Sequence, residues 1–518
     1  MKKPVKIVLV TVAAAAVAAA GLGFVITPEA GKAPNDPAVG IKPFSAASAI
    51  GSNYYRIPAM ITTQDGTVVA AMDARFGGTH DSPNNLEIAV SRSVDGGQVW
   101  TEPELAITFE DWENSGTILR PNGSLTTQDS ASAIDSSLLE DVQTGRIFML
   151  VDAFPYATGA SSAQPGSGYT EVHGQKCLML RKNGEEEYCY TVHPDGFIYD
   201  QDGTKTSYSL NSRYELLENG SPLTVRQKRT FYWYNVAFAL KSGKEVPMNI
   251  LYQDALFQPL PTSYLYLLYS DDGGQTWSDP VDLNGQVKGE DSYFKGVCPG
   301  RGIQIQNGGH AGRLIFPVYE LIPETGEQRF SVIYSDDHGG SWQAGERIAL
   351  TQEINNISET QLVQLPDGSL RSFSRTTAGY VGTAFSTDGG QTWSEPQLVR
   401  EIPLTGGSGC QVSAINYAGK IEGKDAVLLS APAGESRTNG YIYVGLIQEG
   451  ADGRPYEIVW TYKKEVTGAD TYFAYSCLTQ LADGRIGLLY EQANTPQTID
   501  TTVFVPYTVD DLCTATIQ

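Results

Sequence analysis

Short runs rich in Val, Ile, Tyr and Thr, separated by Asx-Gly pairs, make up most of the chain. Such runs predict short β-strands joined by tight turns, because β-branched and aromatic side chains favour strands and glycine supplies the positive φ of a turn. Residues 265–270 (LYLLYS), for example, lead directly into a turn that ends in tryptophan. Long amphipathic helices are hard to find. The pattern therefore predicts an all-β protein.

A tryptophan-ended turn of eight residues occurs four times, and the copies share Ser, Asp, Gly and Trp in register. In such a turn the Asp accepts backbone N–H bonds, a Gly takes positive φ, and the Trp covers apolar surface. We interpret these box turns as structural hairpin tips rather than catalytic elements. They occupy residues 93–100 (SVDGGQVW), 270–277 (SDDGGQTW), 335–342 (SDDHGGSW) and 386–393 (STDGGQTW).

The spacing of the box turns indicates a β-propeller with one four-stranded blade for each later copy. Asp337 follows Asp272 by 65 residues, and Asp388 follows Asp337 by 51. Hairpin tips without the full box bring the expected number to six blades. These further tips are residues 64–66, 365–368 and 481–485.

The gap between the first two box turns is too long for one or two blades, and its middle changes character. Residues 134–154 still resemble blade strands, whereas the following stretch has Gly/Ser-rich flanks, charged turns and short aromatic strands. We predict a small β-rich domain inserted in the propeller, with a role as scaffold or as one wall of a substrate cleft. The predicted domains are 36–155 and 261–518 for the propeller and 156–260 for the insert.

The N-terminus has the features of an export signal. Lys2, Lys3 and Lys6 precede an almost unbroken apolar run over residues 7–26, followed by polar sequence. The run is long enough to span a bilayer, so residues 1–35 are predicted to be a signal peptide or an N-terminal membrane anchor. We favour cleavage, and we expect a secreted or cell-surface protein.

The net charge and the spacing of the cysteines and histidines exclude several classes of partner and cofactor. The 36 basic and 59 acidic residues give a formal net charge of -23, which argues against nucleic acid or an anionic membrane surface as the partner. An anionic substrate would need local positive charge. The six cysteines form no CxxC pair and the five histidines form no HExxH set, so neither metal nor cofactor is expected. Free thiols are favoured over a Cys177–Cys189 bridge.

Several short motifs, together with the box turns, resemble the bacterial sialidases from about residue 50 to the C-terminus. The resemblance implies a six-bladed propeller, and the branch closest in pattern carries a β-rich insertion. The matching motifs are residues 55–58 (YRIP), 358–361 (SETQ), 374–375 (SR), 436–440 (SRTNG) and 475–478 (YSCL).

By this resemblance, Arg56, Arg375 and Arg437 bind the carboxylate on the anomeric carbon of a sialic acid. Arginine suits that task because its planar fork gives bidentate, permanently charged bonds. The resemblance also assigns Tyr475 as nucleophile and Glu359 as its base. A neutral tyrosine avoids the like-charge repulsion that a carboxylate nucleophile would meet, and sialidases are an exception to the two-carboxylate scheme.

The resemblance assigns Asp81 as the general acid and base, and it places Arg75 and Asp135 near the 4-hydroxyl of the sugar. One departure concerns residues 407–409 (GSG), where the family often has an aromatic residue. This departure leaves the shape of one pocket wall, and hence the linkage preference, open.

The expected activity is that of an exo-α-sialidase that retains configuration and acts, as a monomer, on sialylated glycoproteins, glycolipids or oligosaccharides. One alternative is an intramolecular trans-sialidase that releases an anhydro-sialic acid from the same site. Another, of a different class, is a non-catalytic sialic-acid-binding propeller. The complete set of acid, base and nucleophile favours an enzyme.

Overall fold

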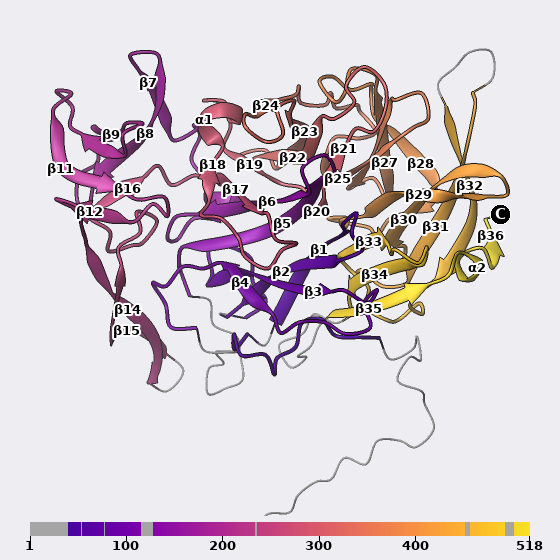
Figure 1. Ribbon diagram of the computed structural model, residues 1–518, viewed down its shortest axis with the longest axis horizontal. Coiled ribbons are helices and arrows are strands. Elements are labelled where there is room, and N and C mark those ends of the chain that lie inside the picture. The colour runs from indigo at the N-terminus through magenta and orange to yellow at the C-terminus, as the bar shows by residue number, and fades with distance from the viewer. Residues whose placement is uncertain are drawn as a thin grey trace, which may run out of the picture. The chain divides into compact units, whose positions relative to one another are not determined.

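Strands account for nearly all the regular structure of the chain (Figure 1). The computed structural model describes residues 40–52, 54–76, 78–114, 128–233, 236–450, 456–492 and 502–517. The predicted signal peptide or anchor at residues 1–35 lies outside them. The described part contains two α-helices of four residues each, α1 (Asn284–Val287) and α2 (Val509–Leu512), and no helix there is long and apolar enough to cross a membrane.

Six sheets form the blades of a propeller, which confirms the predicted all-β, six-bladed fold. They are antiparallel except where the short β20 (Gly300–Arg301) pairs in parallel with β5. The first blade contains β1 (Tyr54–Thr62), β2 (Val68–Arg75), β3 (Leu86–Ser93) and β4 (Glu104–Ile107); the second contains β5 (Ser132–Asp141), β6 (Arg146–Phe154), β17 (Tyr264–Ser270) and β18 (Val281–Asp282); the third contains β19 (Phe294–Val297), β22 (Leu314–Ile322), β23 (Glu327–Ser335) and β24 (Gln343–Ala344).

The remaining blades complete the ring. The fourth contains β25 (Ile357–Gln364), β26 (Leu370–Thr376), β27 (Tyr380–Ser386) and β28 (Gln397–Pro403); the fifth contains β29 (Ser413–Ile421), β30 (Lys424–Pro432), β31 (Gly440–Gln448), β32 (Glu457–Glu465) and the short β36 (Ala515–Thr516); the sixth contains β33 (Ser476–Gln480), β34 (Ile486–Glu491) and β35 (Thr502–Tyr507).

Segments from the two ends of the described chain close the propeller. Strand β1 contacts both β5 and β33, so the first blade lies between the second and the sixth. Ahead of β1, Ile41 pairs with Phe504 of β35: the Ile41 N–H donates to the Phe504 carbonyl at 2.8 Å, and the Phe504 N–H donates back at 2.6 Å. The ring is therefore closed by hydrogen bonds between residues far apart in the sequence.

Each box turn joins the third and fourth strands of its blade. In the second copy, the Ser270 hydroxyl donates to Asp272 at 2.7 Å and accepts the N–H of Gly274, whose φ is +80°. Asp272 Oδ1 also accepts the backbone N–H groups of Gln275 and Thr276, both at 2.9 Å. The turn is held by its own polar atoms, as expected for a structural repeat.

The second blade is interrupted between its second and third strands. Strand β6 pairs directly with β17, with Ala153 opposite Tyr264, although the chain between them builds a further sheet. That sheet contains β7 (Tyr169–Val172), β8 (Gln175–Lys182), β9 (Tyr190–Val192), β10 (Phe197–Tyr199), β11 (Lys205–Leu210), β12 (Leu216–Glu218), β13 (Ser221–Pro222) and β16 (Phe257–Pro259).

Strands β14 (Thr224–Trp233) and β15 (Val236–Pro247) form a separate hairpin within this insert. An apolar cluster continues from the first two blades into the insert, where Tyr214 stacks on Tyr266 of β17 with ring centroids 5.2 Å apart. The insert is thus packed on the propeller rather than tethered to it. The six cysteines are free thiols, and Cys177, Cys298, Cys410 and Cys477 are buried.

Candidate active site

A cavity of about 190 Å³ at the centre of the propeller contains seven of the eight predicted site residues. They come from five different blades, because the beginnings of inner strands and the connections between second and third strands meet at one end of a propeller. The box turns lie at the opposite end of the blades. The seven residues are Arg56, Asp81, Asp135, Glu359, Arg375, Arg437 and Tyr475.

Arg56 is positioned by a bulge in β1 and by a buried carboxylate. The register of β1 shifts between Arg56 and Ala59, and Ile57 has φ +61°, a strained value for a β-branched residue. Glu491 of β34 accepts Arg56 Nε at 3.1 Å and the Ile57 N–H at 3.0 Å through Oε1. The side chain of Glu491 is fully buried. The guanidinium is therefore fixed before any ligand arrives.

Arg375 and Arg437 are oriented by backbone carbonyls of the glycine-rich segment 407–409. Arg375 Nε donates to the Ser408 carbonyl at 2.8 Å, and Arg437 Nη2 donates to the Gly409 carbonyl at 3.3 Å. A Cβ at position 409 would lie 2.3 Å from the carbonyl oxygen of Thr376, and Gly409 has φ +68°. This departure from the family pattern thus supplies carbonyls that aim two of the arginines.

Tyr475 and Glu359 form a short hydrogen bond beside Arg375. The Tyr475 hydroxyl donates to Glu359 Oε1 at 2.6 Å, while Arg375 Nη1 donates to Glu359 Oε2 at 2.8 Å and to the Tyr475 oxygen at 3.0 Å. Burial, and then the carboxylate of Glu359, raise the pKa of Tyr475 well above its ordinary value, although Arg375 and Arg437 oppose this. The tyrosine is therefore neutral, with a base already in contact.

Asp81 lies in the connection between β2 and β3, with 68% of its side chain exposed. Its Oδ1 accepts Arg75 Nη1 at 2.7 Å and lies 3.5 Å from Arg56 Nη1. Partial desolvation by the surrounding protein raises the pKa of Asp81, but the charges of Arg75 and Arg56 outweigh it and hold this pKa at about 2. Arg75 itself does not line the cavity: it is fully buried behind Asp81, where its Nη2 donates to Asp73 at 2.7 Å.

Asp135 belongs to a group of carboxylates that is linked to Asp81 through Asp73 and Arg75. It has φ +60°, and its N–H donates to Asp73 Oδ1 at 3.0 Å. Burial, and then Asp73, raise the pKa of Asp135 well above its ordinary value. Asp152 of β6 also lines the cavity, and burial raises its pKa well above the ordinary range too. Both shifts favour the protonated form, and a protonated carboxyl group can donate a hydrogen bond to a hydroxyl oxygen.

The residues that the sequence analysis did not identify are Glu491, Asp73, Asp152 and Tyr319. Asp73 and Asp152 are lone carboxylates within apolar strands, residues 68–75 (VVAAMDAR) and 147–154 (IFMLVDAF), and that pattern is a detectable signal. Glu491 is likewise the one carboxylate of an apolar strand, residues 486–491 (IGLLYE), whereas Tyr319 follows no such pattern. Tyr319 reaches the cavity from β22 and packs against Phe294, with ring centroids 5.1 Å apart.

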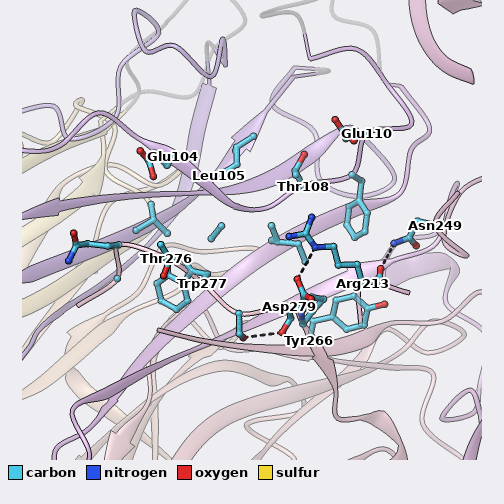
Figure 2. Close-up of a pocket in the computed structure, with 18 of the residues that line it drawn as sticks. Glu104, Leu105, Thr108, Glu110, Arg213, Asn249, Tyr266, Thr276, Trp277 and Asp279 are labelled. Atoms are coloured by element: carbon cyan, nitrogen blue, oxygen red, sulfur yellow. Dashed lines mark hydrogen bonds and ion pairs between the residues drawn. The ribbon is translucent and has the colours of Figure 1, made fainter. Parts of the chain in front are cut away.

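A wider cavity of about 640 Å³ lies elsewhere, between β4, the second box turn and the insert (Figure 2). Arg213 lies in it but is bonded to Asp279, with Nε to Oδ1 at 2.8 Å. Trp277 and Tyr266 form part of its wall. Glu104, Glu110 and Glu215 make its lining predominantly acidic, so it is unsuited to an anionic ligand. Size alone does not identify the active site.

The fold and the central cavity define a β-propeller with Asp-box repeats and an arginine-lined anion site. The model of the BNR repeat-like domain family matches residues 219–488. The chain belongs to the bacterial sialidase family, and the resemblance noted in the sequence is confirmed.

Three relatives illustrate the match. The chain is 40% identical to the anhydrosialidase of Macrobdella decora, over 87% of this chain and 59% of that protein, and 36% identical to sialidase B of Streptococcus pneumoniae, over 87% and 63%. It thus spans about three fifths of the length of these curated relatives. The intramolecular trans-sialidase of Ruminococcus gnavus, solved with oseltamivir carboxylate, superposes with a TM-score of 0.86 at 38% identity, over 93% of this chain and 99% of that one.

Proposed function

We propose that the protein is an exo-α-sialidase that cleaves terminal sialic acid from glycoconjugates with retention of configuration. The observation that carries the proposal is the 2.6 Å hydrogen bond from the Tyr475 hydroxyl to Glu359, placed among three arginines. A binding protein needs the arginines but has no use for a neutral hydroxyl paired with a base.

In the first half of the reaction, the three arginines bind the substrate carboxylate and so place the anomeric carbon beside Tyr475. Glu359 takes the phenolic proton as the tyrosine oxygen attacks, because the raised pKa of Tyr475 leaves it un-ionised without that base. Asp81 protonates the departing glycosidic oxygen. The result is a tyrosyl-sialoside and a free aglycone.

Asp81 acts again when the intermediate is resolved. Its carboxylate takes a proton from water, the water oxygen bonds to the anomeric carbon, and Glu359 returns its proton to the phenolate. Asp81 must gain a proton before the first step, since its pKa in the ligand-free site is about 2. A substrate carboxylate on the arginines adds negative charge close to Asp81 and offsets Arg56, so substrate binding raises this pKa in the required direction.

A second candidate differs only in how the intermediate is resolved. In an intramolecular trans-sialidase, a hydroxyl of the sugar replaces water and yields an anhydro product. The names of two relatives favour it: one is an anhydrosialidase and another an intramolecular trans-sialidase. Both reactions require the same residues for the steps that form the tyrosyl-sialoside.

Product analysis on 3'- and 6'-sialyllactose tests both candidates and reports linkage preference. Hydrolysis gives free sialic acid, and intramolecular transfer gives a product lighter by one water. We expect Tyr475→Phe to lower turnover by several orders of magnitude, as expected for loss of a nucleophile. Near-normal release of either product by Tyr475→Phe contradicts the proposed mechanism.

The expected substrates are sialylated glycoproteins, glycolipids or oligosaccharides, and we propose that the protein acts on them as a monomer outside the cell. The basis for export is the sequence of residues 1–35, with its lysines and apolar run. Cell fractionation and sedimentation velocity test these two proposals separately. Retention of the protein in the cytoplasm contradicts the first, and a stable dimer contradicts the second.

A further inference from the structure

The β14–β15 hairpin carries an unusual concentration of exposed apolar side chains. Five of the nine large apolar residues that are exposed in the described part of the chain lie on it. Their exposed fractions range from 39% to 62%, with Trp233 the highest of the five. The five are Phe231, Trp233, Val236, Phe238 and Leu240. Exposed apolar surface that is gathered in one place marks an interaction site.

The strand register places all five on one face of the hairpin. Phe231 pairs with Phe238, and Trp233 pairs with Val236, so these side chains project from the same side. The other face is directed at the protein: Thr230 accepts a hydrogen bond from Gln128, and Lys228 is buried. The apolar face therefore points away from the body of the insert.

The hairpin belongs to the same side of the propeller as the active site. The insert replaces the connection between the second and third strands of its blade, and the equivalent connections in other blades carry Asp81 and Arg437. The stem of the hairpin is also linked to the loop that holds Asp81. Gln128, which bonds Thr230, donates its N–H to Asn84 Oδ1 at 3.2 Å.

The charge of the hairpin is opposite to that of the whole protein. Residues 224–247 contain five basic side chains and one acidic one, Glu245, whereas the chain has a formal net charge of -23. Lys228 is buried, and Lys241 and Lys244 pair with acidic residues outside the hairpin, so its two arginines carry the accessible positive charge. Arg226 and Arg229 are exposed, and Arg229 lies opposite Leu240 at the border of the apolar face. Aromatic residues next to basic ones are typical of segments that bind the interface of an anionic bilayer.

We propose that the β14–β15 hairpin is an interfacial membrane anchor. Phe231, Trp233 and Phe238 enter the boundary between headgroups and acyl chains, while Arg226 and Arg229 contact anionic headgroups. The hairpin does not span the bilayer, because the edges of a two-stranded sheet need hydrogen bonds that hydrocarbon cannot supply. A second copy of the chain is disfavoured as occupant, since pairing would bring like-charged hairpins and like-charged proteins together.

The test uses the full chain and the fluorescence of Trp233, because the apolar run at residues 7–26 can bind vesicles by itself and contains no tryptophan. The difference between wild type and Trp233→Phe isolates the Trp233 signal. With vesicles of phosphatidylcholine and phosphatidylserine, we expect this signal to shift to shorter wavelength and to be quenched by brominated acyl chains. Arg229→Gln should weaken the effect about fivefold.

A matched control and a second variant separate the possible outcomes. Phe231→Ser with Phe238→Ser should weaken partition of the hairpin at least about tenfold. Val94→Ser with Val99→Ser, exposed in the first box turn, should change nothing. Turnover of soluble sialyllactose should be equal in all variants, so a failed anchor is distinguished from a failed enzyme. A Trp233 signal that vesicles leave unchanged, or a dimer that the Phe variant dissociates, overturns the proposal.

Discussion

Replacement of Arg375 by lysine tests whether the arginine fork, and not just its charge, holds the substrate. Arg375 donates from Nε to the Ser408 carbonyl at 2.8 Å and from Nη1 to Glu359 and Tyr475 at 2.8 and 3.0 Å. A planar guanidinium can make these bonds and still present N–H groups to a carboxylate. A lysine has one ammonium group and cannot reach all of these positions at once.

The expected fall in kcat/KM follows from the hydrogen bonds that a lysine at position 375 cannot make. Retention of the positive charge keeps Glu359 paired, so the fold should be preserved. Loss of the anchor to Ser408 and of one bond to the substrate carboxylate removes two charge-assisted hydrogen bonds, together worth about 3 kcal/mol. We therefore expect Arg375→Lys to lower kcat/KM roughly 150-fold.

Steady-state kinetics on a fluorogenic sialoside measure this change, with Arg371→Lys as the matched control. Arg371 lies on the same strand, β26, but its Nη2 donates to the Tyr456 carbonyl at 3.1 Å, away from the cavity. We expect its kcat/KM to stay near wild type. The reasoning is refuted if Arg375→Lys retains kcat/KM within about threefold of wild type, since the fork would then contribute little beyond its charge.

Three further predictions concern proton uptake on substrate binding, the buried ion pair between Arg56 and Glu491, and the second box turn. Binding of a non-hydrolysable sialoside to the wild type near pH 5 should take up protons, at most one, because substrate charge raises the low pKa of Asp81. Calorimetry in buffers of different ionisation enthalpy measures this uptake, and Asp81→Asn should abolish it. Glu491→Gln should lower the free energy of unfolding by about 3 kcal/mol, because it leaves the buried Arg56 without its counter-charge, whereas the exposed Glu465→Gln should leave a denaturant melt unchanged. Asp272→Ala removes the acceptor of its box turn and should cost about 2 kcal/mol of stability with kcat/KM intact; an equal loss of activity would contradict its structural role.

The fold was predictable because its signals are local. Each box turn needs a serine, an aspartate and glycines within a few residues, as Ser270, Asp272 and Gly274 show. The spacing of these turns then indicates blades. The interruption of the second blade was visible as a change in composition, but no local pattern gave the direction of the β14–β15 hairpin. That direction depends on contacts with residues 111–113 and 128, which are distant in the sequence.

The candidate site was predictable only in part. The motifs around Arg56, Glu359 and Tyr475 carry a family resemblance, and the structure brings these residues together. Glu491 was missed because its partner lies in the first blade while it lies in the last, so the pair exists only once the ring is closed. Arg75 was recognised as part of the site, but its complete burial behind Asp81 comes from packing that no motif reports.

The direct pairing of β6 with β17 has a consequence for protein engineering. Because Ala153 and Tyr264 lie directly opposite each other, the insert leaves and returns to the propeller at almost the same point. The entropy of closing a loop grows slowly with its length, so any module with adjacent ends can be exchanged at this position if it also covers Tyr266 and its apolar neighbours. Chimaeras made here would keep the catalytic centre while replacing the module beside it.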